Sequence, residues 1–302
     1  MIKIKDHLKR FFKKKAVPVS SSDDVKTAPL SEEQLQTVSL EETKYYPIQV
    51  IVGTSQSIGR QRDHNEDALF YLNAVLADAE REQPFGIFIV ADGMGGHENG
   101  ELASSIACKT MSEFLIQRLY KAFFSVNSEP PLESIQEIME AGVQQAQQAV
   151  LTQAHGGGTT LSAALLVGGQ ITIAHVGDTR IYLIYPDGRL QSVTQDHSLV
   201  RKLVELGQIS ESEAAVHPQR NVLYRALGQN EPVQPEIKTI PTPINGYMLL
   251  CSDGLWGVVS DNDIFKIISR GKNVSEAALN LINAANASGG PDNISSLLVH
   301  FC

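Results

Sequence analysis

Five aspartates spread along the chain each stand where a strand would meet a turn, and four of them adjoin an apolar run of β-prone residues. They lie in the segments Asn65-Glu66-Asp67, Val90-Ala91-Asp92-Gly93, Gly177-Asp178-Thr179, Cys251-Ser252-Asp253-Gly254 and Pro291-Asp292-Asn293. A carboxylate at the end of a buried strand costs free energy unless a positive charge accompanies it, and several at one place repel one another. Hard divalent cations such as Mg²⁺ and Mn²⁺ bind oxygen ligands. The pattern therefore predicts a carboxylate site for one or more hydrated divalent ions.

Each aspartate taken alone has a second interpretation, because Asp-Gly is also a frequent tight-turn dipeptide. The chain contains a comparison in Tyr185-Pro186-Asp187-Gly188, which lies between two strand-like segments and is predicted to be a plain hairpin turn. The turn and the metal site explain any one of the five equally well. The set of five, with its flanking residues, favours the metal site.

Length and composition bound the fold and the partners. With 302 residues and 42% apolar residues, the chain suits one large domain with a tail, or two small domains. The net charge of −9 argues against nucleic acid as a partner. Three cysteines without metal-ligand spacing fit a reducing cytoplasm. No apolar run approaches the length of a membrane span.

The N-terminus differs from the rest of the chain. Residues 1–15 are rich in lysine and place apolar residues at helical spacing, so a weak contact with an anionic membrane surface is one interpretation. A disordered basic tail is the preferred one, because the segment is short for a stable helix. Residues 16–46 have the composition of a linker. We therefore predict a basic N-terminal segment and linker over 1–46 and a folded domain over 47–302.

The periodicity of the body indicates both strands and helices. Strands are predicted at 48–54, 68–72, 85–91, 159–167, 170–176, 180–185, 247–252 and 293–301, and helices at 100–124, 132–153, 261–270 and 275–287. The strands between 159 and 185 are expected to form an antiparallel meander. Residues 196–230 are expected to form a helical flap, in which Ser210 and Glu213 have the spacing of a capping box. Consecutive antiparallel strands with paired helices between them favour an α+β fold.

Seven short segments of the body are informative as an ordered set. They are Gly59-Arg60-Gln61-Arg62 through Asn65-Glu66-Asp67, Asp92-Gly93-Met94-Gly95-Gly96-His97, Gly158-Thr159-Thr160, Gly177-Asp178-Thr179-Arg180, Asp196-His197-Ser198, Ser252-Asp253-Gly254-Leu255-Trp256 and Asp292-Asn293. In this order they resemble the metal-dependent protein phosphatases of type 2C, in their bacterial form. The resemblance covers residues 48–302 and implies a four-layer α-β-β-α sandwich of two antiparallel sheets flanked by helices, with the metal site at one edge.

The resemblance also implies roles for the carboxylates. Asp67 and Asp92 would be the central ligands of two Mn²⁺ or Mg²⁺ ions, and Gly93 would add a backbone carbonyl. Asp253 and Asp292 would complete the second ion. Two further acidic residues have implied roles: Glu66 would act through metal-bound water, and Asp178 would hold a third, weaker ion. Two such ions about 3.5–4 Å apart can lower the pKa of a water molecule that attacks a phosphate ester.

Three other residues are candidates beside the metal. Arg62 is expected to bind phosphate oxygens with its guanidinium, the alternative being a surface arginine paired with Glu66 or Asp63. His97 could protonate the leaving oxygen or could bind the metal shell or the loop, and the two interpretations are equally good. Asn293 is expected to support its neighbouring ligand without binding the metal itself.

The predicted function is hydrolysis of phosphoserine and phosphothreonine in proteins by metal-activated water. The expected partners are phosphorylated proteins, among them a serine/threonine kinase or its substrates, and the enzyme is expected to be a cytoplasmic monomer. Two alternatives remain: a phosphoprotein-binding module without turnover, and a phosphatase dedicated to one regulator. The complete ligand set favours catalysis over the first alternative, and the long flap favours a broader substrate range over the second.

Overall fold

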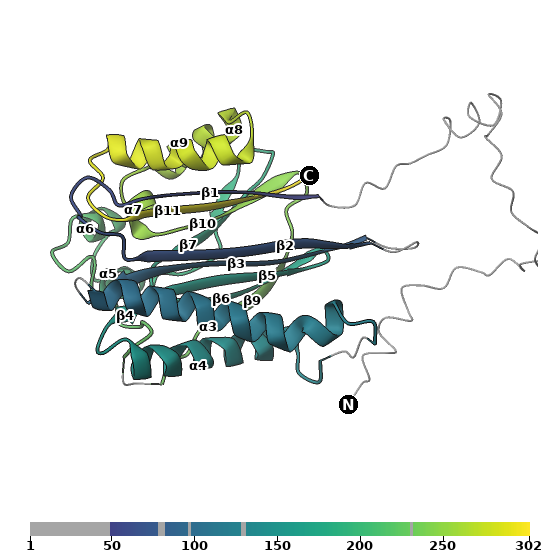
Figure 1. Cartoon of the computed structure of the whole chain (residues 1–302). Helices are drawn as coiled ribbons and strands as arrows, with labels where there is room; N and C mark the ends of the chain where they lie inside the picture. Colours follow the sequence, from purple (N-terminus) through teal and green to yellow (C-terminus); the bar gives the residue numbers. More distant parts are fainter. Residues whose placement is uncertain (1–48, 78–81, 96–97, 128–130, 230–231) are drawn as a thin grey trace, which may run out of the picture. The chain divides into compact units, whose positions relative to one another are not determined.

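Two antiparallel sheets pack face to face, and a pair of helices covers the outer face of each (Figure 1). This computed structural model describes residues 49–77, 82–95, 98–127, 131–229 and 232–302. The layers run in the order helices, sheet, sheet, helices. The predicted α+β sandwich is therefore confirmed.

Sheet A has five strands in the order β1-β11-β10-β7-β8. Their bounds are Val50–Ser57 for β1, Ile294–Phe301 for β11, Gly246–Cys251 for β10, Arg180–Ile184 for β7 and Leu190–Ser192 for β8. Helices α8 (Asp261–Arg270) and α9 (Val274–Ala287) lie on the outer side of this sheet.

Sheet B has the order β2-β3-β5-β6-β9, and the short strand β4 also pairs with β3. Their bounds are Asp67–Ala77 for β2, Glu82–Met94 for β3, Leu161–Val167 for β5, Gln170–Val176 for β6, Glu236–Pro241 for β9 and Gly158–Thr159 for β4. Helices α3 (Glu98–Phe123) and α4 (Ile135–Gln153) cover its outer face.

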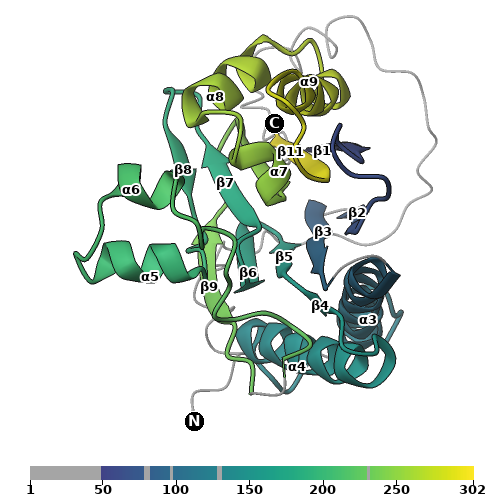
Figure 2. The same ribbon diagram turned by 90° about the vertical axis from the view of Figure 1, so that its left-hand side faces the viewer.

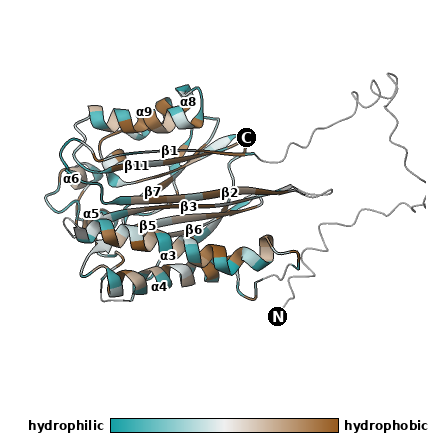
Figure 3. Ribbon diagram, in the orientation of Figure 1, coloured by the Kyte–Doolittle hydropathy of each residue, from teal (hydrophilic) through white to brown (hydrophobic). Residues whose placement is uncertain are grey.

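The alternation of side chains along β3 shows how the apolar strands fill the molecule. Ile87 and Ile89 pack in the apolar layer under α3 and α4, whereas Phe88 and Val90 pack between the two sheets. All four are buried, because a strand covered on both faces is apolar at every position. Figure 3 shows apolar residues along the strands and mixed polar and apolar residues on the helices.

The expected meander from 159 to 185 is wrong in two respects. First, β6 and β7 belong to different sheets, so residues 177–179 cross from sheet B to sheet A instead of forming a hairpin. Second, the expected strand 159–167 is divided at Thr160, whose backbone N–H donates to the carbonyl of Asp92. In a sequence, two consecutive strands joined by a short glycine turn predict a hairpin. Here the turn contains Asp178 and connects sheet B to sheet A at the edge of the sandwich.

Helix α4 begins three residues later than predicted. Its N-cap is Ser134, and Ser134 with Glu137 forms a capping box that the sequence prediction did not include. Leu132, which was assigned to the apolar face of this helix, is 99% exposed instead.

The segment from 196 to 229 leaves the sandwich as the predicted flap. It carries helices α5 (Leu199–Glu205) and α6 (Glu211–Ala215), and the capping box of Ser210 and Glu213 is present. The flap is closed at its base by a bridge between Ser198 and Leu223.

Strand β9 and the one-turn helix α7 (Asp253–Trp256) were not predicted. The hairpin at Asp187-Gly188 between β7 and β8 is confirmed, since the N–H of Gly188 donates to the carbonyl of Tyr185.

The predictions for residues 1–46 and for the start of the first strand lie outside the described residues. Among the residues that are described, no helix is long and apolar enough to cross a membrane.

Candidate metal centre and phosphate groove

Asp67 and Asp92 lie directly opposite each other on neighbouring strands of sheet B. Asp67 is the first residue of β2, and its Oδ2 accepts hydrogen bonds from the hydroxyls of Ser252 and Ser295, each 2.7 Å long. Both serines belong to the region of sheet A. The carboxylate of Asp67 is therefore held between the two sheets. Figure 2 shows β2 and β3 side by side, viewed from one end of the sandwich.

The turn before β2 is packed tightly against the end of β3. The N–H of Gly93 donates to the carbonyl of Glu66 over 3.1 Å, and the hydroxyl of Ser104 in α3 donates to the same carbonyl over 2.5 Å. A Cβ at position 93 would lie 2.2 Å from the carbonyl oxygen of Gly100, so only glycine fits there. This packing fixes the backbone of Glu66, whose side chain is buried, directly before β2.

Asp253 and Asp292 reach the same edge from the other sheet. Asp253 opens α7 directly after β10, and Asp292 stands two residues before β11. Asn293 organises this corner: its side chain accepts from the N–H of Glu66 over 2.8 Å and donates to the carbonyls of Ile58 and His64, each over 2.9 Å. The supporting role expected for Asn293 fits these contacts.

Four of the five aspartates that the sequence singled out have a raised pKa, and the charges of neighbouring carboxylates contribute to each shift. Burial raises the pKa of Asp67 to about 7, and the charges of Asp253 and Asp292 add to this shift. Burial and then the charge of Asp292 raise the pKa of Asp253 to about 6. The pKa of Asp92 is raised by burial and by the charge of Asp67, and that of Asp178 by burial and by the charge of Asp253. Such mutual repulsion means that the carboxylates gather at one place.

Two oxygens of this group are buried and accept no hydrogen bond from any described residue. They are Oδ1 of Asp67 and Oδ1 of Asp253. A buried acceptor without a donor costs about 1–3 kcal/mol, and more when it is charged. A cation bound by both would remove that cost, and a donor set made of oxygens suits Mg²⁺ or Mn²⁺ better than zinc. The residues present therefore fit hard divalent ions.

Asp178 lies in the turn that crosses between the sheets, and it is 7% exposed. The indole N–H of Trp256 donates to its backbone carbonyl over 3.0 Å. Trp256 is the last residue of α7, the helix that Asp253 opens. The turn and α7 are thereby joined, which brings the two aspartates to one wall.

A groove of about 950 Å³ opens beside Asp178, Asp253 and Asp292. Its walls come from α5, α6, α7, β8 and β9, and Arg62 also lines it. The side chain of Arg62 is 48% exposed and its Nη2 lies 2.8 Å from Oδ2 of Asp292. The alternative pairing with Asp63 or Glu66 is not the one found. Arg62 instead presents its guanidinium where the carboxylates meet the groove.

The structure adds residues to the site that sequence reasoning did not select. His64 was assigned to packing or solvent, but its Nδ1 contacts Asp63 and its Nε2 contacts Glu66, each at 2.9 Å. Ser295 was missed as well, although a Ser-Ser pair in an otherwise apolar strand was a signal for it. His97 lies outside the described residues, so its two interpretations remain as they were.

A model of the family described as protein phosphatase 2C matches residues 51–294. The chain belongs to the protein phosphatase 2C family. It is 37% identical over 247 residues to a protein of Listeria innocua named serine/threonine phosphatase stp, and the match covers 80% of this chain and 92% of that protein.

Solved structures agree with this membership. The Streptococcus agalactiae serine/threonine phosphatase is 30% identical, with a TM-score of 0.71, and the match covers 83% of this chain and 99% of that one. The catalytic domain of PstP, a serine/threonine protein phosphatase solved in complex with two manganese ions, is 29% identical, with a TM-score of 0.68 over 85% of this chain and 99% of that one. The predicted family, fold and enzyme class are confirmed.

Proposed function

We propose that this protein phosphatase 2C hydrolyses phosphoserine and phosphothreonine in proteins, with Mn²⁺ or Mg²⁺ held by Asp67, Asp92, Asp253 and Asp292. The observation that carries the proposal is the pair of buried, unpartnered oxygens on Asp67 and Asp253 within a group of mutually repelling carboxylates. When bound, the ions would lower the pKa of water and screen the negative charge of the phosphoryl group.

The residues of the chain supply the rest of the site. The serines on Oδ2 of Asp67 leave its Oδ1 as the oxygen available to a cation. The guanidinium of Arg62 would bind two phosphate oxygens, since its planar fork matches that geometry. The carbonyl of Gly93 would complete the first set of ligands and Glu66 would act through metal-bound water, while Asp178 would hold a third ion at the groove wall.

The groove sets where a substrate would lie. Its volume of about 950 Å³ exceeds that of a phosphorylated side chain, so it can accept neighbouring residues of the substrate too. We propose phosphoproteins as substrates, with a serine/threonine kinase or its substrates as partners. We also propose that the enzyme acts in the cytoplasm as a monomer, and that the folded catalytic domain covers residues 47–302.

The test is hydrolysis of a phosphothreonine peptide by the purified chain with Mn²⁺, with Mg²⁺ and with a chelator. We expect turnover that requires metal and falls about 100-fold or more in Asp253→Asn, because a lost ligand costs more than a lost supporting contact. Asp187→Asn is the matched control, since it changes the same Asp-Gly dipeptide in the β7–β8 hairpin.

The control variant should keep full activity. A folded protein that shows no turnover with either metal would contradict the proposal and would leave phosphoprotein binding without catalysis as the function to test.

A further inference from the structure

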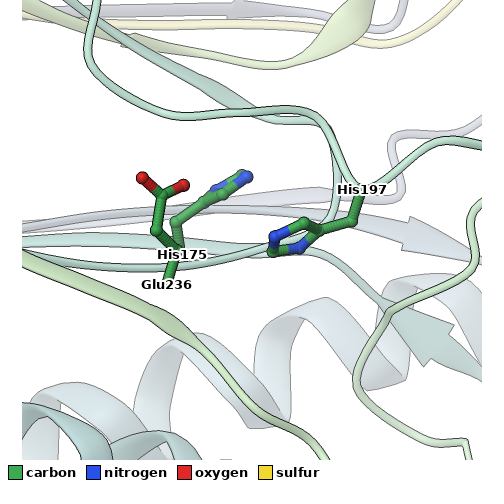
Figure 4. Close-up of side chains that lie close together, drawn as sticks. All are labelled: His175, His197 and Glu236. Carbon is green, nitrogen blue, oxygen red and sulfur yellow. The ribbon is translucent and has the colours of Figure 1, made fainter. Parts of the chain in front are cut away.

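A second group of polar side chains borders the groove, whose lining includes Glu236. His175 on β6 stands directly opposite Glu236 on β9, and His197 at the base of the flap lies near both (Figure 4). One ligand atom from each residue lies within 4.8 Å of the others, so the group could be taken for a metal site.

The hydrogen bonds of His175 and Glu236 argue against a metal. Nε2 of His175 lies 3.1 Å from the carbonyl of Gln195, which can only accept, so this nitrogen carries the proton. Nδ1 then accepts from the hydroxyl of Ser162 at 2.9 Å. The Glu236 oxygens accept from the N–H of Gln195 and from Lys238. Each atom of His175 and Glu236 that could bind a metal is therefore already in a hydrogen bond within the protein.

His197 is engaged in a different direction. Its Nδ1 accepts from the backbone N–H of Gly177 over 3.1 Å, so the proton of the neutral ring is on Nε2. Nη1 of Arg225 lies 3.3 Å from Nε2, and because both groups are donors in this tautomer the contact is not a hydrogen bond. A fixed positive charge at that distance disfavours a cation here and keeps the imidazole neutral. Burial, with the charges of His175 and Arg225, lowers the pKa of His197 to about 3.

The contact with Gly177 is double. The backbone N–H of His197 donates to the carbonyl of Gly177 over 2.8 Å, while its ring accepts from the N–H of the same residue. Gly177 has φ of +108°, and a Cβ there would lie 2.5 Å from Cγ2 of Thr160, so the position requires glycine. Glycine leaves the backbone free to rotate unless other groups hold it. His197 holds both of its hydrogen-bonding groups.

The same turn is held at its other end by the residue before His197. Asp196 accepts two hydrogen bonds from the guanidinium of Arg180, 2.9 and 2.7 Å long, and this guanidinium stacks 3.5 Å from the centre of the Trp256 ring. Two successive residues at the base of the flap, Asp196 and His197, therefore contact the residues that follow Asp178 and precede it in the turn.

We propose that His197 is a positioning residue, which fixes the Gly177 backbone from the base of the flap and thereby sets the Asp178 carboxylate for a divalent cation. The inference rests on the proposed function, in which Asp178 is a metal ligand. In this proposal the imidazole of His197 acts as a hydrogen-bond acceptor, and neither of its nitrogens binds a metal.

The test compares two variants of the full chain. In His197→Asn the amide oxygen replaces Nδ1 as an acceptor at the same distance from Cβ, whereas in His197→Leu a methyl group occupies that place. Binding of Mn²⁺ is followed by electron paramagnetic resonance of the free ion, with Asp178→Asn as the reference for the step that depends on Asp178.

We expect His197→Leu to weaken, by about 10-fold, the Mn²⁺-binding step that Asp178→Asn also weakens. Tenfold is the lower limit for a lost supporting contact. His197→Asn should stay within about threefold of the natural protein, and the tighter Mn²⁺ binding should be unchanged in both. If His197→Leu does not fold, His197→Gln takes its place, because its amide reaches the position of Nε2 and leaves the Gly177 N–H without an acceptor.

Three results would overturn the inference. The first is equal weakening in the asparagine and leucine variants, which would mean that ring packing matters and the acceptor does not. The second is stoichiometric Zn²⁺ binding that His197→Leu abolishes. The third is unchanged Mn²⁺ binding in Asp178→Asn, which would remove Asp178 as a ligand, while the phosphopeptide assay with Asp253→Asn would still decide the proposed function.

Discussion

Hydrogen bonds decide which oxygen of Asp67 a cation can use. Ser252 and Ser295 both donate to Oδ2, and Oδ1 is left buried and without a described donor. The two hydroxyls stabilise the ionised form of a carboxylate whose pKa burial raises to about 7. In the proposed function the two hydroxyls would therefore support metal binding without contacting the metal.

Adjacent serines on β11 give a direct test of this support. Ser295→Ala removes one hydrogen bond to Asp67, so we expect Mn²⁺ affinity to fall about 10-fold, and the Mn²⁺ concentration for half-maximal activity to rise correspondingly. Ser296→Ala is the matched control, because the Ser296 hydroxyl is buried without a described hydrogen-bond partner and can be lost at little cost. Equal effects of the two substitutions on Mn²⁺ titrations would contradict this role for Ser295.

At the residue scale, the sequence supported the choice of ligands but not of their partners. Asp67, Asp92, Asp253 and Asp292 could be selected because isolated carboxylates beside apolar strands are costly. The contact of Ser295 with Asp67 could not, since it depends on which side chains the two sheets bring together. It joins residues more than two hundred positions apart, which no local pattern encodes.

At the scale of elements, apolar periodicity predicted most helices and strands, because long buried segments have strong patterns. It did not predict the crossing after β6, since a short glycine turn is compatible with either a hairpin or a change of sheet. It also missed β9, a partly exposed edge strand whose residues carry a weak pattern.

The two capping boxes offer a comparison between a core helix and a flap helix. Ser134→Ala should destabilise α4 by about 1 kcal/mol, which corresponds to a decrease in Tm of about 2–4 °C, with unchanged kcat. Ser210→Ala removes the same pair of bonds from α6, whose only buried residue is Ala214, so we expect little change in Tm. Thermal unfolding followed by circular dichroism checks both. An equal decrease in the two variants would mean that the flap unfolds together with the core.

At the scale of the whole molecule, the two packed sheets bury the carboxylates and thereby make the stability of the fold depend on pH. The raised pKa values of Asp67 and Asp253, about 7 and about 6, mean that the folded protein holds protons that the unfolded chain has released above about pH 4. This contribution to stability is present at low pH and is lost as the pH rises through 6 and 7. The buried, neutral His175 and His197 act in the opposite direction, because their pKa values are lowered.

The increase in Tm on adding Mn²⁺ distinguishes the protons on the aspartates from the effect of the histidines. Metal binding must displace the protons on Asp67 and Asp253, so the increase should be larger at pH 8 than at pH 6. Scanning calorimetry with Mn²⁺ and with a chelator at both pH values measures it. The same increase at both would show that no proton is displaced from these aspartates. Asp187→Asn, far from the buried group, should leave the difference unchanged.

The pairing of β1 with β11 has a consequence for how the protein is made. β11 lies between β1 and β10, and it is the only strand among the described residues that pairs with β1. On the ribosome, the nascent chain must keep β1 as an unpaired edge until residues 294–301 have emerged, and such edges invite association with other chains. Asp292 and Ser295 arrive with the same stretch. We therefore expect the unfinished polypeptide to be both aggregation-prone and catalytically silent, and both conditions to end together when β11 is inserted.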